Sequence, residues 1–197
     1  QPAAKMYFES DIPDVPLCDA TAPFSIEPYF DGSRVRSSFT GQELSEVILE
    51  TLEIKREECW LTTLVKVFLF DDDHVKKYHR LGKEITENKS RYKSYANLSL
   101  QWIRQELEIA NPIAIILLGP EVISSLLLIS EEEAMECITG KVIEKKIIWK
   151  NSNFICLPPP GVILDRSARN PWPRKFAMKI GPTAMKEIQR LKAQPTL

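Results

Sequence analysis

An uninterrupted apolar run, Pro112–Leu118, is the sequence feature that most restricts how this chain folds. Every position of the run is apolar, which is typical of a parallel strand that is buried on both faces. The run ends at Gly119-Pro120, and the next residues, Glu121–Leu128, predict a helix with the proline in its first turn. A buried strand that leads directly into a helix indicates an α/β fold.

Helical and strand-like patterns alternate along the rest of the chain. Gly41–Leu52 and Leu98–Ile109 predict amphipathic helices, because aliphatic residues recur there at helical spacing. The other expected elements are strands at Lys5–Glu9, Cys59–Val67, Val142–Trp149 and Asn153–Leu157, and a closing helix at Pro182–Lys192. We therefore expect one domain over residues 1–197, with a three-layer α/β/α fold and a central, mostly parallel sheet.

Two segments interrupt this alternation. A long irregular loop is expected over about residues 14–40, where Pro16, Pro23 and Pro28 break any regular pattern. A loop of this length inside a compact domain usually has a function. Residues 71–93 are densely charged and predict an exposed helical or mobile excursion from the domain.

The composition is that of a globular protein. Hydrophobic residues make up 44% and charged residues 27% of the 197 residues. The apolar runs are shorter than the ~20 residues that a membrane span needs, and Gln1–Lys5 does not resemble an export signal. We expect an intracellular protein of the cytoplasm or nucleus, without a membrane partner. No metal or other cofactor is expected, because the two histidines lie in a charged stretch and no C-x-x-C pair joins the four cysteines, Cys18, Cys59, Cys137 and Cys156.

Sequence motifs of nucleotide-dependent enzymes are missing. The chain contains no G-x-G-x-x-G, no G-x-x-x-x-G-K-[ST] and no G-x-S-x-G, and only seven glycines in total. The net charge is −1, so any affinity for nucleic acid has to come from a local cluster of cations.

Such a cluster follows the strand expected at Asn153–Leu157. A Pro-Gly turn, Pro159–Gly161, presents three apolar residues, and no acidic residue occurs between Arg166 and Gly181. Apolar residues beside cations suit a protein that separates stacked bases and neutralises phosphates. The candidate contacts are an apolar wedge, Val162, Ile163 and Leu164, and the cations Arg166, Arg169, Arg174 and Lys175. The alternative is that the wedge packs into the core and that the cations are simply solvated.

The order of six segments along the chain is more informative than any one of them alone. The segments are Lys5–Pro13, Gly41–Ile54, Trp60–Lys66, Pro112–Gly119, Thr139–Lys141 and Leu157–Arg166. In this order they resemble the uracil-DNA glycosylase superfamily, most closely its bacterial and archaeal iron–sulfur branch, family 4. The resemblance covers nearly the whole chain and is carried by the colinear set rather than by one motif. It implies a parallel sheet between helices, and a DNA-binding protein of DNA repair that acts through base flipping.

Positions that carry the family's chemistry are altered in this chain. The family's G-E-x-P-G segment corresponds to Ser10–Asp14, where Asp11 keeps a carboxylate that can position water. The family's base-reading Asn corresponds to Thr63, whose hydroxyl cannot make the paired contact of an amide. The motif His, which stabilises the departing uracil anion, corresponds to Pro159, and losing one such group costs on the order of 10²–10³ in rate.

Two further features of the family are changed. Val67 stands where a cluster cysteine would be, and no cysteine occurs between Cys59 and Cys137, so we expect no iron–sulfur cluster. The aromatic residue that stacks on the base corresponds to Phe30 or Phe39, because the loop that precedes the first helix is longer and differently spaced here.

Three hypotheses follow. The first is a divergent member of the superfamily that binds DNA or an unpaired or flipped base, with little or no glycosylase activity. The second is an active DNA glycosylase that hydrolyses the N-glycosidic bond of uracil or a damaged base, with Asp11 positioning water and Thr63 contacting the base. The third is a protein-interaction module on the same fold, which joins a larger assembly through residues 71–93.

Overall fold

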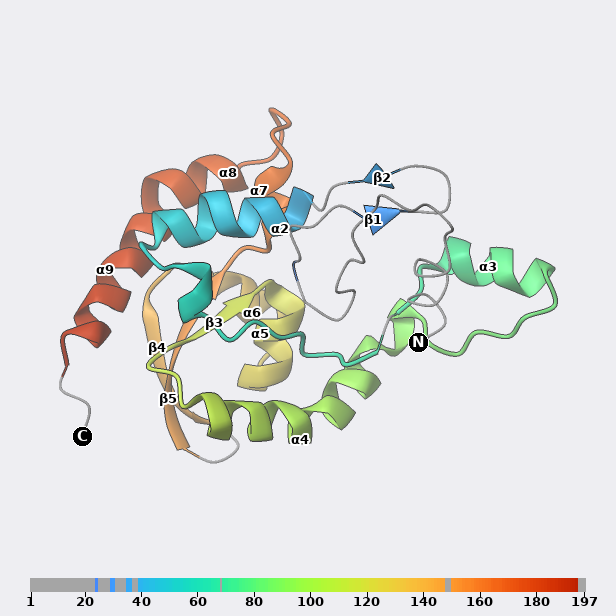
Figure 1. Cartoon of the computed structure of the whole chain (residues 1–197), viewed down its shortest axis with the longest axis horizontal. Helices are drawn as coiled ribbons and strands as arrows, with labels where there is room; N and C mark the ends of the chain where they lie inside the picture. The colour runs from blue at the N-terminus through green and yellow to red at the C-terminus, as the bar shows by residue number, and fades with distance from the viewer. Residues whose placement is uncertain are drawn as a thin grey trace.

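The computed structural model describes residues 24, 29–30, 35–36, 39–67, 69–147 and 150–194. Within these residues the chain is a mixed α/β structure around a sheet of three strands (Figure 1). The strands are β3 (Ile115–Leu118), β4 (Val142–Ile147) and β5 (Lys150–Leu157), and their order in the sheet is β3-β5-β4. The α/β class expected from the sequence is confirmed.

The described sheet is mixed, although a mostly parallel one was expected. β3 pairs with β5 in parallel, with Leu118 opposite Leu157. β4 pairs with β5 in the antiparallel direction, with Val142 opposite Ile155. β4 and β5 are neighbours in the sequence, and a connection of a few residues can join only antiparallel strands.

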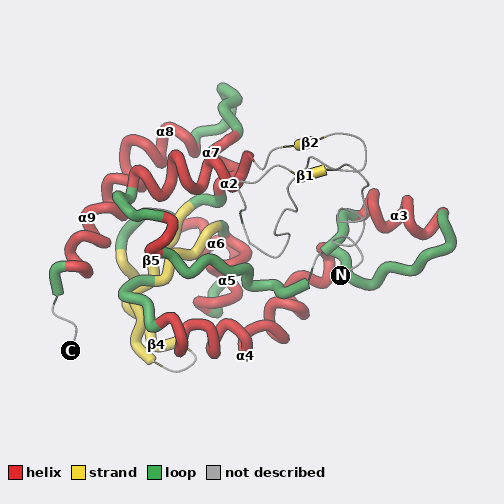
Figure 2. The backbone as a smooth tube through the Cα atoms, in the orientation of Figure 1, coloured by secondary structure: helices red, strands yellow, loops and turns green. Residues whose placement is uncertain are grey.

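Helices cover the sheet on opposite sides (Figures 1 and 2). On one side, α2 (Phe39–Glu43) continues into a π-helical stretch, and α8 (Trp172–Lys175) continues through another into α9 (Gly181–Lys192). α4 (Tyr92–Ala110) lies on the other side. The remaining described elements are α3 (Asp72–Arg80), α5 (Pro120–Leu127), α6 (Glu131–Glu136), α7 (Pro160–Leu164), two 3₁₀ turns at Arg56–Glu58 and Lys89–Arg91, and the ribbon of β1 (Tyr29–Phe30) and β2 (Val35–Arg36).

The four predicted helices are confirmed, with one large change of boundary. α4 begins at Tyr92, six residues before the expected start at Leu98, because the additional turns also bury side chains such as Ala96. It ends at Asn111, whose φ of 40° is left-handed, as is common for a residue that terminates a helix.

The strand expected at Cys59–Val67 is not formed. Leu64 is buried as the apolar pattern predicts, but these residues have no strand partner in the described part of the chain. Side-chain contacts hold the segment instead, since the backbone N–H of Lys66 donates to the hydroxyl of Ser99 (3.4 Å). The strand expected at Lys5–Glu9 lies outside the described residues, as does most of the 14–40 loop.

The core lies between the sheet and its helices. Its largest fully buried side chains come from every layer: Ile48, Leu52, Ile123, Leu127, Ile155, Leu157, Ile163 and Phe176. None of the helices described here is both long enough and apolar enough to cross a membrane.

Candidate nucleic-acid interface

The two parallel strands end side by side, so the segments that follow them meet at one edge of the sheet. Gly119, after β3, donates its N–H to the carbonyl of Leu157 at the end of β5 (3.0 Å). Gly119 has a φ of 98°, and a Cβ at this position would lie 3.6 Å from ring carbons of Pro159. Pro159 therefore lies close against the turn after β3. Ligands of open α/β sheets bind at this kind of edge.

Only part of the predicted apolar wedge is exposed. The wedge forms α7, with Pro160 in its first turn. Ile163 is 0% exposed and belongs to the core, Val162 is half-buried, and Leu164 is 36% exposed. The alternative reading, in which these residues pack inside, therefore holds for Ile163. Leu164 is the most exposed apolar side chain of the three.

The loop between α7 and α8 projects from the body of the molecule (Figure 1). It is braced by its own polar groups. The side-chain amide of Asn170 donates to the carbonyls of Val162 (2.6 Å) and Asp165 (2.7 Å), and its oxygen accepts from the N–H of Trp172 (3.1 Å). The carboxylate of Asp165 in turn accepts from the N–H of Ser167 (3.0 Å). These bonds preorganise the loop, which lowers the entropy cost of binding a ligand.

The four predicted cations lie on this loop and on α8, and we call residues 166–175 the basic segment. Arg169 and Arg174 are exposed, and neither has a carboxylate partner among the described residues. The ammonium of Lys175 lies 5.2 Å from the centre of the Trp172 ring, a cation–π distance. Arg166 differs from the others, because it donates to the carboxylate of Glu43 (2.9 Å).

The contact of Arg166 with Glu43 brings α2 to the basic segment. α2 also packs against α7, where a Cβ on Gly161 would lie 3.8 Å from the methyl group of Thr40. Phe39, the first residue of α2, lies four residues before Glu43 and therefore on the same face of the helix. Of the two predicted stacking residues, Phe39 is exposed at the start of α2, whereas Phe30 lies in β1.

The two predicted catalytic residues are not brought together in the described structure. Asp11 lies outside the described residues. Thr63 is exposed, and its hydroxyl donates to the carbonyl of Val65 (3.0 Å). Among the described residues, no group of three or more His, Cys, Asp or Glu side chains could hold a metal ion.

The charge of Glu121 acts on the phenol of Tyr92, a relationship that sequence reasoning missed. Tyr92 begins α4, and Glu121 lies in the first turn of α5. Burial of the Tyr92 phenol, together with the nearby carboxylate of Glu121, raises the pKa of Tyr92 to about 12. Neither residue belongs to a motif, and no spacing in the sequence indicates that one acts on the other.

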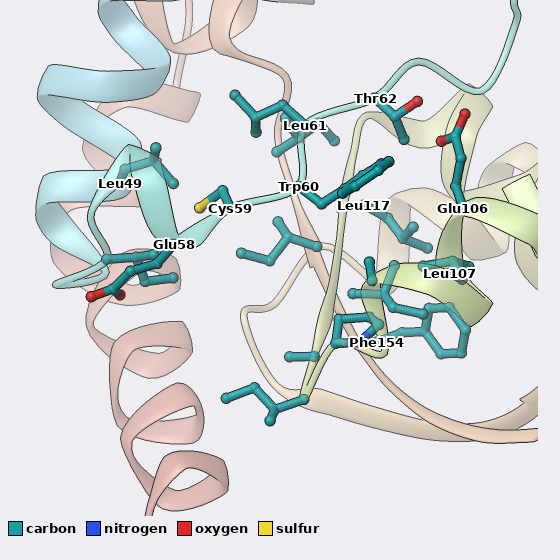
Figure 3. Close-up of a pocket in the computed structure, with 18 of the residues that line it drawn as sticks. Leu49, Glu58, Cys59, Trp60, Leu61, Thr62, Glu106, Leu107, Leu117 and Phe154 are labelled. Atoms are coloured by element: carbon teal, nitrogen blue, oxygen red, sulfur yellow. The ribbon is translucent and has the colours of Figure 1, made fainter.

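A second feature is a cavity of about 540 Å³ between the Cys59–Leu64 segment, α4 and strands β3 and β5 (Figure 3). Most of its lining is apolar. Leu61, Leu107, Leu117 and Phe154 are among the apolar residues, whereas Glu58, Thr62 and Glu106 are polar.

The polar part of this cavity contains one ion pair. The ammonium of Lys66 donates to Oε1 of Glu106 (2.6 Å) and to the hydroxyl of Thr62 (2.5 Å). Burial alone would raise the pKa of Glu106, but hydrogen bonding to Lys66, Thr62 and Trp60 and the charge of Lys66 together hold this pKa below its ordinary value. The ammonium of Lys66 therefore favours the ionised form of the Glu106 carboxylate.

Comparison of the chain with protein-family models and with curated proteins finds no match.

Proposed function

We propose that this chain is a divergent protein of the uracil-DNA glycosylase type that binds DNA or an unpaired base and has little or no glycosylase activity. The observation that carries the proposal is the basic segment, where Arg169, Arg174 and Lys175 are exposed on and next to a braced loop. Cations with no carboxylate partner are available to bind phosphates, and such contacts dominate affinity for nucleic acid.

The place of the basic segment in the fold supports the same proposal. α7, which leads into the segment, begins three residues after the end of β5, at the edge of the sheet where ligands of α/β proteins bind. The order of the six segments that resemble the superfamily also supports it. The proposal includes the superfamily's three-layer α/β/α fold, with which the observed α/β class is compatible.

Little or no catalysis is proposed because two chemical groups of the family are replaced. Pro159 stands in place of the His that stabilises the departing base, and a proline side chain can neither donate a hydrogen bond nor carry charge. Thr63 stands in place of the base-reading Asn, and its hydroxyl already donates to a backbone carbonyl. Removal of a single stabilising group costs on the order of 10²–10³ in rate.

The binding experiment measures fluorescence anisotropy of a labelled oligonucleotide over a series of salt concentrations. We expect Arg169→Ala and Arg174→Ala to weaken binding, each lowering the slope of log K against log[salt] by about 0.7–0.9. Lys76→Ala on α3, a cation in an exposed surface pair, is the matched control and should change nothing. Absence of binding at low salt, or unchanged binding by the double arginine variant, would overturn the proposal.

The catalytic part is tested by a base-release assay on single- and double-stranded oligonucleotides with uracil, hypoxanthine or xanthine. We expect no release above background. Release by the wild-type chain that Asp11→Ala abolishes would show that the protein is an active glycosylase.

A further inference from the structure

We infer that the cavity between the Cys59–Leu64 segment, α4 and strands β3 and β5 binds a small, neutral aromatic molecule that donates one N–H group to Glu106. No residue of α7 or of the basic segment is among the described residues that line this cavity. The ligand site is therefore separate from the nucleic-acid interface and does not depend on the proposed function.

The size and the lining of the cavity fit a ligand of this class. Its volume of about 540 Å³ is within the ~300–1,000 Å³ that small-molecule sites usually have. Most of the lining is apolar, and two aromatic residues, Trp60 and Phe154, belong to it (Figure 3). Aromatic side chains favour aromatic ligands, because offset or edge-to-face contacts between rings add to the effect of burial. Trp60 is 58% exposed, so a ligand that covers its ring also removes apolar surface from water.

One polar atom of the lining residues lacks a hydrogen bond. Oε1 of Glu106 accepts from the ammonium of Lys66 (2.6 Å), whereas Oε2 is buried, and no hydrogen bond of ordinary length and angle reaches it within the described part of the chain. The side chain of Trp60 lies beside this carboxylate (Figure 3) and helps to lower its pKa, but it leaves Oε2 unsatisfied. A buried carboxylate oxygen without a donor is unfavourable. An N–H group of a ligand that reaches Oε2 therefore stabilises the complex.

The charges around the cavity favour a neutral ligand. The ammonium of Lys66 compensates the carboxylate of Glu106, so this part of the cavity carries no net charge. Glu58, which also lines the cavity, is paired with Lys192 (3.3 Å), and Glu57 is exposed to solvent. A charged ligand would lose its hydration without gaining a free countercharge beside Glu106. A neutral N–H group meets Oε2 without this cost.

The test titrates the full chain with indole and with benzofuran by isothermal titration calorimetry. The two molecules have nearly the same size and shape, but an oxygen of benzofuran replaces the N–H group of indole. We expect indole to bind at least about tenfold more tightly, which is the factor that corresponds to one hydrogen bond to a charged group. Equal affinities for the two molecules, or no binding of either at millimolar concentration, would overturn the inference.

Variants of the lining locate the site. Ala114→Phe places a large ring at a position that lines the cavity and should abolish binding of both molecules. The double variant Lys66→Met with Glu106→Leu replaces the ion pair by apolar side chains of similar size, a change that folds often tolerate. It should remove the preference for indole over benzofuran. Trp102→Ala, which removes an exposed ring of α4 outside the described lining, is the matched control and should change neither affinity.

Each variant gives a separate result, once circular dichroism has shown that it folds. Unchanged binding of indole by Ala114→Phe would place the ligand elsewhere and overturn the inference. A preference for indole that persists in the double variant would overturn the role of Glu106. If one variant does not fold, the other variant and the two molecules on the wild-type chain still decide the question. Binding of oligonucleotides to the basic segment is measured separately, so failure of this inference is distinguishable from failure of the proposed function.

Discussion

The carboxylate of Glu43 and the guanidinium of Arg166 meet at 2.9 Å across 123 positions of the sequence. Glu43 is only 6% exposed, whereas the side chain of Arg166 is 58% exposed. A carboxylate removed from water needs a partner, and Arg166 supplies its charge and a hydrogen bond. We therefore expect Arg166 to position the basic segment on α2, and Arg169 and Arg174 to contact phosphates.

Arg166→Ala should lower the free energy of unfolding by about 1–3 kcal/mol, because it leaves a buried carboxylate without its ion-pair partner. Arg169→Ala, at an exposed position without such a partner, should change stability by no more than about 0.5 kcal/mol. Urea denaturation measures both. Adding Glu43→Gln to Arg166→Ala should recover part of the loss, and strictly additive effects would show that the two residues are not coupled.

Ile163→Ala should destabilise the protein by about 2–5 kcal/mol, because Ile163 is completely buried in the core. Leu164→Ala, the neighbouring position, should cost less than about 1 kcal/mol, since its side chain is partly exposed. Thermal or urea unfolding compares the two variants. Equal effects would contradict the division of the wedge into one core residue and one surface residue.

Gly140→Ala should strongly destabilise the fold. Gly140 has a φ of 76°, and a Cβ there would lie 2.2 Å from the carbonyl oxygen of Ile180, which is far inside contact distance. Gly82 is the matched control, because its φ is 71° but no atom lies within 4 Å of the corresponding Cβ. Gly82→Ala should therefore cost only the backbone strain, about 1–2 kcal/mol. A similar loss in both variants would mean that the close approach at Gly140 is relieved at little cost.

The stability of the protein should fall as the pH rises from about 10 to about 12, in part because of Tyr92. The pKa of Tyr92 is about 12 in the folded chain and about 10 in the unfolded chain, so only the unfolded chain loses the phenol proton in this interval. Protonation then favours the folded state below pH 10, and this contribution is lost as the pH approaches 12. Tyr92→Phe should unfold with a smaller decrease over the same interval. Identical pH profiles of wild type and variant would contradict this assignment.

Local sequence patterns correctly predicted those elements in which the spacing of the buried side chains matches the period of the secondary structure. The apolar run Pro112–Leu118 became β3, and the pattern at Pro182–Lys192 became α9, because a repeating apolar position reflects the face that is buried. The same rule was wrong for Cys59–Val67. An apolar run indicates that side chains such as Leu64 are buried. It does not indicate whether another strand lies beside the run and pairs with it through backbone hydrogen bonds.

The sequence by itself determined the α/β class, the position of four of the helices and the concentration of cations in the basic segment. These depend on propensities and patterns within short stretches of chain. Only the tertiary structure decided that Ile163 is inside and that Arg166 is bound to Glu43. These relationships arise because α2 packs against α7, and contacts between residues far apart in the chain depend on that packing rather than on either segment alone.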